Sequence, residues 1–105
     1  MKIALIGSTQ FLDKFEKRKK NLLAGGHKVR IPQFDNPATN ELEVCEYNRS
    51  IIEWADRVDV IWDNRSVGTL FDFGMAFALR KPIKIIYIES RAFENVFRLY
   101  ENYGH

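Results

Sequence analysis

Hydrophobic residues along the chain alternate between short apolar runs and longer amphipathic segments. The short runs are rich in Ile and Val, a pattern typical of strands. They predict strands at Ile3–Ile6, Lys28–Ile31, Val58–Trp62 and Ile83–Ile88. Apolar residues at helical spacing predict a helix after each strand, at about Phe11–Ala24, Glu41–Ala55, Leu70–Leu79 and Arg91–Tyr103.

Strands that alternate with helices at these separations predict an α/β fold with a parallel sheet and right-handed crossovers. We expect a single flavodoxin-like or Rossmann-like domain over residues 1–105, with about four or five strands, an order of about 2-1-3-4, and helices on both faces. In that order the first and third strands are neighbours. Their crossovers leave toward opposite faces, so a crevice is expected beyond their carboxyl ends.

The stretch Val58–Ala76 combines a predicted strand, a polar turn and an almost wholly apolar helix. A helix of that composition is expected to be buried. Its one ionisable side chain is Asp72, which we expect in the first helical turn. The exposed amide groups of that turn would keep the Asp72 carboxylate ionised.

Two polar turns follow the first and third predicted strands, and each precedes a helix. Because the two strands are expected to be neighbours, the helix amino termini would converge on one crevice and offer a place for an anion, most simply a phosphate. Ordinary helix capping also explains each turn by itself. The candidate ligand-binding residues in the two turns are Gly7, Ser8, Thr9, Asp63, Ser66, Gly68 and Thr69.

Composition limits the classes of partner. A chain of 105 residues buries a limited fraction of its surface, so we expect a homodimer or a higher homo-oligomer. The formal net charge of +2 does not favour a nucleic-acid polymer or a membrane as partner, and the basic run Lys14–Lys20 is expected to be a solvated helix face. The single Cys45 has no Cys or His at metal spacing, so no metal site is expected. The lone thiol and the absence of a signal-peptide pattern predict the cytoplasm.

A motif around Asp72 resembles a known family. The pattern is S-x-G-x-x-x-[acid]-x-G-x-A, filled here by Ser66, Gly68, Asp72, Gly74 and Ala76. Together with GS after the first strand and the segment Ala55–Asp59, it is similar to the nucleoside 2-deoxyribosyltransferase-like proteins, which include deoxynucleoside 5'-monophosphate N-glycosidases. The resemblance implies cleavage or exchange of the bond between a nucleobase and deoxyribose.

The resemblance also implies roles for individual residues. Asp72 matches the carboxylate nucleophile, which in the family is usually a glutamate and so one methylene longer. Ser66 resembles the serine that binds the 5'-phosphate in the monophosphate hydrolases, which implies a nucleotide ligand. The family as a whole implies a nucleoside or nucleoside 5'-monophosphate, and no cofactor is expected. Family members often close the pocket with a second subunit. Tyr100 and Asn102 are candidates for that contribution, and the alternative is that they pack against their own sheet.

Other roles stay open in the sequence. Asp35, Asp63 or a carboxylate on the second helix would assist the leaving base. Asn48 and Arg49 are expected to face solvent, and the alternative is that they face the crevice. Trp62 is expected in the core because it lies in a strand, and the alternative is that it stacks on a nucleobase. The same crevice is also compatible with a non-catalytic nucleotide-sensing module. A third hypothesis is a structural subunit whose two turns serve only as helix caps.

Overall fold

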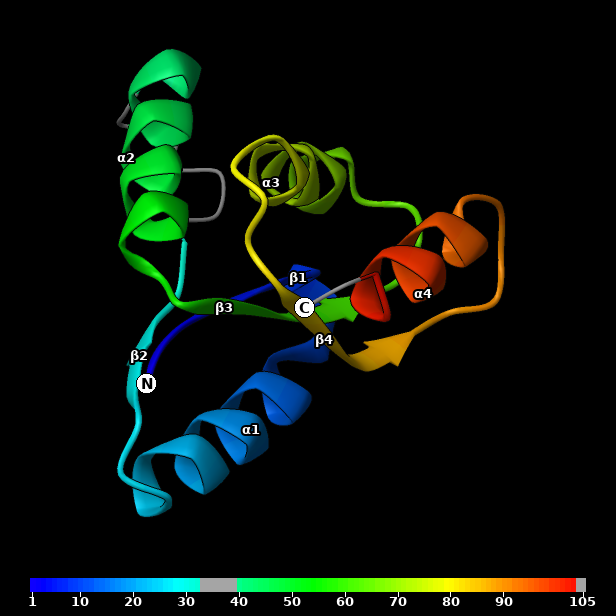
Figure 1. Ribbon diagram of the computed structural model, residues 1–105. Helices are drawn as coiled ribbons and strands as arrows, with labels where there is room; N and C mark the ends of the chain where they lie inside the picture. The colour runs from blue at the N-terminus through cyan, green and yellow to red at the C-terminus, as the bar shows by residue number, and fades with distance from the viewer. Residues whose placement is uncertain (33–39, 104–105) are drawn as a thin grey trace.

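The computed structural model describes residues 1–32 and 40–103 (Figure 1). The strands are β1 (Lys2–Gly7), β2 (Lys28–Arg30), β3 (Arg57–Trp62) and β4 (Ile83–Ile88). A short 3-10 turn, η1 (Thr9–Phe11), precedes the helices α1 (Leu12–Ala24), α2 (Glu41–Trp54), α3 (Val67–Ala78) and α4 (Glu94–Glu101). The last helix was predicted from about Arg91 and begins at Glu94. None of the helices in the described part of the chain has the length and apolar content that a bilayer crossing needs.

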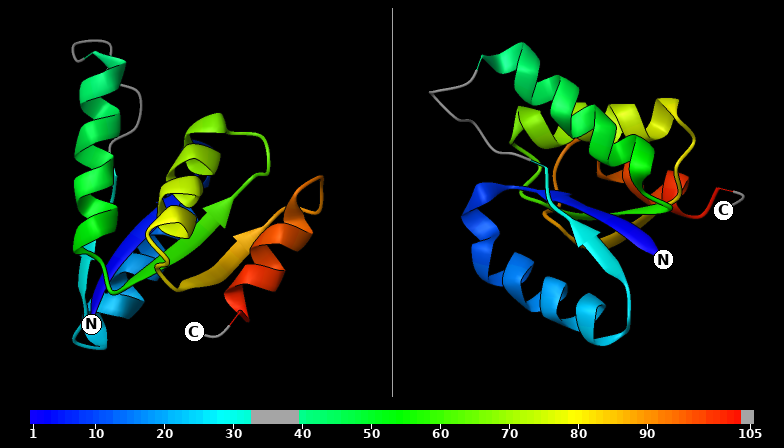
Figure 2. Two further views of the ribbon diagram at one scale, coloured as in Figure 1. Left: turned by 45° about the horizontal axis from the view of Figure 1, so that its top comes forward. Right: turned by 90° about the vertical axis from the view of Figure 1, so that its left-hand side faces the viewer.

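The described strands form one parallel sheet of four strands in the order β2-β1-β3-β4, which confirms the predicted α/β fold and strand order. Strand β2 lies on one side of β1, and the next strand along the chain, β3, lies on the other side of β1. Because both crossovers are right-handed, the reversal places α1 and α2 on opposite faces of the sheet. Helices α3 and α4 lie on the same face as α2 (Figures 1 and 2).

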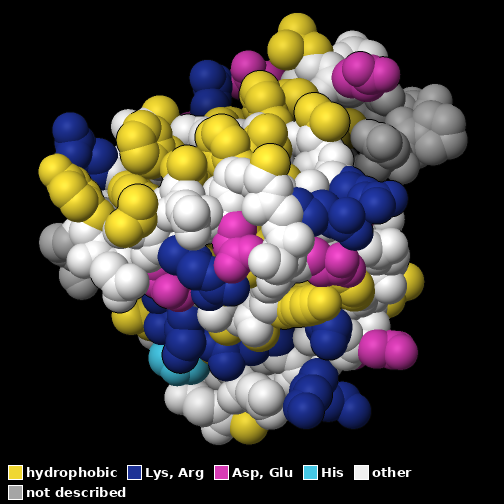
Figure 3. All heavy atoms as spheres, turned by 90° about the vertical axis from the view of Figure 1, so that its right-hand side faces the viewer, with side chains coloured by type: hydrophobic (Ala, Val, Ile, Leu, Met, Phe, Trp, Pro, Cys, Tyr) yellow, Lys and Arg dark blue, Asp and Glu magenta, His cyan; other side chains and the backbone are white. Residues whose placement is uncertain are grey.

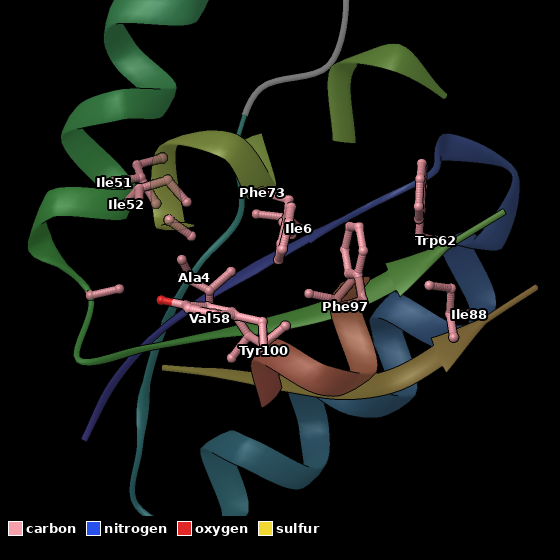
Figure 4. Packing of buried hydrophobic residues seen from close by; sticks show 14 residues of the cluster. Ala4, Ile6, Ile51, Ile52, Val58, Trp62, Phe73, Ile88, Phe97 and Tyr100 are labelled. Atoms are coloured by element: carbon pink, nitrogen blue, oxygen red, sulfur yellow. The ribbon is translucent and has the colours of Figure 1, made fainter. Parts of the chain in front are cut away.

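The larger buried cluster lies between the sheet and helices α2, α3 and α4 (Figure 4). An aromatic stack joins β3 to two of these helices. The ring centroids of Trp62 and Phe97 are 4.8 Å apart, and those of Phe97 and Phe73 are 3.8 Å apart. Trp62 is 2% exposed, so its predicted place in the core is confirmed. A smaller cluster under α1 contains Leu5, Phe15 and Ile61.

One position of the central strand β3 is charged although it is fully buried. Asp59 is 0% exposed and points toward α1. Arg18 of α1 donates from Nε and Nη2 to Asp59 Oδ2 at 3.0 and 2.9 Å, and Arg57 donates from Nε to Oδ1 at 2.7 Å. A buried carboxylate requires such partners, because losing its hydration is very costly. The prediction that the basic run of α1 is wholly a solvated face is therefore wrong for Arg18.

Two expectations about helix faces are also wrong. Asn48, expected to face solvent, is 6% exposed because it shares the buried side of α2 with Val44, Ile51 and Ile52. Arg49 does face solvent. The apolar helix α3 was expected to be buried, but within residues 1–32 and 40–103 its buried residues are Thr69, Asp72, Phe73 and Ala76, which share one side of the helix.

We predict that Arg18→Ala lowers the free energy of unfolding by about 2–3 kcal/mol, because Asp59 would keep only one partner in a fully buried position. The matched control is Arg49→Ala, which removes an exposed ion pair with Glu46 and should cost less than about 1 kcal/mol. Chemical denaturation of the two variants measures the difference. Equal losses would contradict a special role for the buried pair.

Candidate functional site

The turn after β1 and the turn after β3 are in direct contact. Strands β1 and β3 are neighbours, and the backbone N–H of Ser8 donates to the carbonyl oxygen of Ile61 at 2.9 Å. Gly7 permits this approach, because a Cβ atom at that position would lie 1.9 Å from the same carbonyl oxygen. The prediction that the two turns meet at one edge of the sheet is confirmed.

Side chains of the two turns form one hydrogen-bonded group, called here the turn cluster, made of Ser8, Asp63, Ser66 and Thr69. Ser8 Oγ accepts from the backbone N–H of Asp63 at 2.9 Å and donates to Asp63 Oδ1 at 2.8 Å. The Oγ atoms of Ser8 and Ser66 are 3.0 Å apart, and Ser66 Oγ donates to Thr69 Oγ1 at 2.8 Å. Ser8 and Thr69 are buried, so the cluster reaches solvent through Asp63 and Ser66.

Asp63 also holds the second turn with its side chain. Its Oδ1 accepts from the backbone N–H groups of Arg65 and Ser66, each at 2.9 Å. Burial disfavours the charged carboxylate, but these two N–H donors and the hydroxyls of Ser8 and Ser66 outweigh burial and hold the pKa of Asp63 below its ordinary value. Two backbone donors of this turn are therefore already bound to an ionised side chain and are closed to an external anion.

The first amide groups of α3 are the donors that remain. Val67, Gly68 and Thr69 follow the N-cap residue Ser66, and their N–H groups make no hydrogen bond to a residue that the structure describes. Val67 and Gly68 are exposed. The amino terminus of this helix therefore presents N–H donors that no described residue occupies, together with partial positive charge, beside the turn cluster. Such a place suits a negatively charged group.

Asp72 lies on the buried side of α3 and in its second turn, since the helix begins at Val67. The predicted place in the first turn is wrong. Asp72 is 8% exposed, and no hydrogen bond or ion pair joins its carboxyl group to a residue within the described part of the chain. Burial raises the pKa of Asp72 to about 7. The expectation that the amide groups of the first turn keep this carboxylate ionised is therefore also wrong.

Helical spacing connects Asp72 to the turn cluster. Thr69 and Asp72 are three residues apart, so they share one side of α3 and lie about 4.5 Å apart along the helix axis. Farther along, the same side becomes apolar at Phe73 and Ala76. A ligand held at the cluster and at the free N–H groups would thus have a poorly solvated carboxyl group about one helical turn away.

Other residues predicted for the site lie apart from this arrangement. Thr9 is exposed in η1, and Gly68 offers its N–H group but lies on the exposed side of α3. Tyr100 packs in the core of its own chain, and its hydroxyl donates at 2.8 Å to the carbonyl oxygen of Lys81. Lys81 precedes β4 and so lies at the amino-terminal ends of the strands, whereas the turns of the site lie at their carboxyl ends. Asn102 is exposed at the end of α4, where its amide donates to a carbonyl oxygen of the same helix.

Two residues that the sequence did not assign to the site contact it. Gln10 Nε2 donates to Asp63 Oδ2 at 3.2 Å, and Arg91 Nε donates to the carbonyl oxygen of Asp63 at 3.4 Å. Gln10 belongs to the first polar turn and was one residue from the candidates. Arg91 follows β4. The predicted strand order could have placed it near the site, because β4 lies next to β3 and the two parallel strands end at the same edge of the sheet.

The chain matches no protein-family model and no curated protein. Within residues 1–32 and 40–103, no three His, Cys, Asp or Glu side chains are grouped so that they could hold a metal ion. Asp35, a candidate acid for the leaving base, lies outside the described residues. The resemblance to the nucleoside 2-deoxyribosyltransferase-like family is therefore a hypothesis that rests on the motif.

We predict that Asp72→Asn stabilises the protein at neutral and alkaline pH. The folded pKa of about 7 lies above the ordinary value of 3.8, so the folded state holds a proton that the unfolded state has lost between these values. The contribution of Asp72 to stability therefore falls as pH rises through this window, by up to about 4 kcal/mol. Thermal or chemical unfolding of both proteins from acid to alkaline pH should show a difference that grows and then levels off above about pH 7.

Asp63→Asn is the control, because its effect on the free energy of unfolding should have the opposite sign. The pKa of Asp63 is lowered, so its contribution is present above the ordinary value and is lost as pH falls through the folded pKa. This variant should be less stable than the wild type at neutral pH. A stabilising Asp63→Asn, or an Asp72→Asn variant that is destabilised at all pH values, would contradict the assigned environments.

Proposed function

We propose that this protein binds a nucleoside or nucleoside 5'-monophosphate at the edge formed by the turns after β1 and β3. It then hydrolyses the N-glycosidic bond, or transfers the deoxyribosyl group, through Asp72. The supporting observation is a buried carboxyl group without a partner among the described residues, placed beside a hydroxyl cluster and free helix N–H groups. Such an acid lowers stability, and strongly shifted pKa values concentrate at functional sites. The motif resemblance supplies the reaction class.

The chemistry needs a negative charge near the anomeric carbon. Breaking the N-glycosidic bond builds positive charge on the sugar, and a carboxylate in a poorly solvated place stabilises that charge better than water does. The carboxylate can also attack the carbon, so that the base leaves and water or another base later takes the sugar. Both roles require ionised Asp72, and a pKa of about 7 leaves about half of the molecules in that form at neutral pH.

The remaining groups suit the sugar and its 5' substituent. The N–H groups of Val67 and Gly68 favour a phosphate, because the helix amino terminus carries partial positive charge. Ionised Asp63, hydrogen-bonded within the same cluster as Ser66, opposes a second negative charge and accepts well from a sugar hydroxyl. The helix N–H groups favour a phosphate and ionised Asp63 disfavours one. The proposal therefore includes both nucleosides and nucleoside 5'-monophosphates as ligands.

A non-catalytic nucleotide-binding or sensing module is the second candidate. The observation that favours it is the raised pKa of Asp72, because a protonated carboxyl group donates a hydrogen bond to a ligand and does not attack it. The site would be the same, with Asp72 acting as a donor. For both candidates the proposed compartment is the cytoplasm, where the free thiol of Cys45 stays reduced.

Incubation of the purified protein with each deoxynucleoside and each deoxynucleoside 5'-monophosphate, followed by chromatography for free base, tests the catalytic proposal. We expect base release by the wild type and a loss of at least about a hundredfold in Asp72→Asn, because the nucleophilic or charge-stabilising group is gone. Equal release by both proteins would refute the role of Asp72. Calorimetric binding without release would select the sensing module.

The pH dependence of kcat/KM gives an independent check of that role. A nucleophile must be ionised, so activity should rise with pH through about 7 and then level off. A carboxyl group that acts as a proton donor would give the opposite slope. If the protein is catalytic, the profile therefore separates a nucleophilic Asp72 from an Asp72 that protonates the leaving base, even though Asp72→Asn would be inactive in both cases.

Ser66→Ala tests the turn cluster as the binding site. Ser66 Oγ makes no cap hydrogen bond to the helix, so the change removes ligand contacts and the bonds to Ser8 and Thr69 without removing a cap. We expect the affinity for a nucleoside 5'-monophosphate to fall about tenfold, as for one lost hydrogen bond of about 1–1.5 kcal/mol. Ser50→Ala, which alters an exposed serine of α2, is the calorimetric control and should leave the affinity unchanged.

A further inference from the structure

Two arginines share one buried carboxylate on the α1 side of the sheet. Asp59 Oδ2 accepts from Nε and Nη2 of Arg18 and from Nη2 of Arg57, and Asp59 Oδ1 accepts from Nε of Arg57. One negative charge thus faces two positive charges, and no other described acid forms an ion pair with either arginine. The two arginine side chains are only 19% and 22% exposed, so water hydrates the remaining positive charge poorly.

The two guanidinium groups, called here the arginine pair, still have donors to offer. A guanidinium group carries five N–H donors, and the Nη1 group of neither Arg18 nor Arg57 donates to a residue within 1–32 or 40–103. The carboxylate of Asp59 fixes both planar groups through Nε and Nη2. Their Nη1 groups are therefore held in advance in an orientation that an anion can use, which lowers the entropy cost of binding.

Two exposed lysines add positive charge beside the arginine pair. Lys84 of β4 is the register partner of Asp59, so its side chain lies on the same face of the sheet, one strand away at about 4.8 Å. Lys14 precedes Arg18 by one turn of α1, and its Nζ lies 4.5 Å from the ring centre of Tyr87 on β4. Neither lysine forms an ion pair with a described residue. Figure 3 shows Lys and Arg side chains gathered on the lower part of the molecule, where α1 lies.

We propose that the arginine pair, together with Lys84 and Lys14, binds the phosphate group of a small phosphorylated molecule. Four cations and one carboxylate leave a formal charge of +3 at this place. A phosphate monoester supplies about two negative charges and three acceptor oxygens, and it accepts well from guanidinium groups. A carboxylate ligand would supply only one negative charge.

This anion site is separate from the turn cluster. Arg57 is the first residue of β3 and Asp63 follows the last, so the two places lie about 20 Å apart along the strand. The inference therefore does not rest on the proposed function.

A single phosphate group suits the arrangement better than a nucleic-acid chain does. The two guanidinium groups converge on one carboxylate, so their remaining donors lie close together and can contact one anion. Helix α1 also carries the exposed acids Asp13 and Glu16, which would repel the further phosphates of a polymer. A small ligand avoids that repulsion.

Titration of the full chain with inorganic phosphate, followed by NMR of the arginine Nε–H groups, tests the site. We expect the Arg18 and Arg57 signals to shift and saturate with phosphate, and to stay in place with sodium chloride of equal ionic strength. Lys84→Glu should lower the affinity read from these signals by at least about tenfold, because attraction becomes repulsion. This variant should fold, since Lys84 is exposed.

Lys28→Glu is the matched control, because it makes the same charge change at an exposed lysine of the other edge strand, β2. Its neighbour Val29 packs on the α1 side, so Lys28 points to the opposite face of the sheet. This variant should bind phosphate like the wild type. Ser66→Ala should also leave the shifts of the arginine signals unchanged, which separates this site from the turn cluster.

Three results would overturn the proposed phosphate site. The first is a wild type whose arginine signals do not respond to phosphate. The second is folded Lys84→Glu with the affinity of the wild type, and the third is an equal loss in Lys28→Glu, which would show attraction by net charge alone. A short oligodeoxynucleotide that shifts the signals where inorganic phosphate does not would also overturn it, and would assign this surface to nucleic acid.

Discussion

Close contact between the carboxyl ends of β1 and β3 is the constraint on which the candidate site depends. The backbone N–H of Ser8 donates to the carbonyl oxygen of Ile61, and Gly7 is the residue that lets the two chains come this near. Residues more than fifty positions apart thereby share one hydrogen-bonded cluster. The parallel strand order supplies the adjacency, and the small side chains of the first turn allow the second turn to settle against it.

Three aspartates near this sheet show how surroundings assign different roles to one side chain. Asp59 is fully buried and is paired with two arginines, so it contributes to structure. Asp63 is surrounded by N–H and hydroxyl donors that keep it ionised. Asp72 is buried and has no such donor among the residues that the structure describes, and its pKa moves to about 7. Carboxyl groups whose environments push their pKa values in opposite directions are what acid, base and nucleophile roles require.

The sequence alone determined the local elements and their order. Apolar runs and helical spacing located the four strands and four helices, and the alternation of strands with helices implied a parallel sheet with the 2-1-3-4 order. The turns at Ser8 and Ser66 could be placed at one edge because parallel strands end together. These predictions succeed because they depend on periodicity and chain connectivity, which are properties of the sequence itself.

Only the tertiary structure decided the electrostatic state of each acid and the side that each helix buries. Whether Asp72 is ionised depends on the number of donors and the amount of water around it, which neighbours from other elements determine. The pairing of Asp59 with Arg18 joins residues 41 positions apart, and Asn48 turns inward because Ile51 and Ile52 must reach the sheet. Such outcomes are set by contacts between distant segments, and no local pattern encodes them.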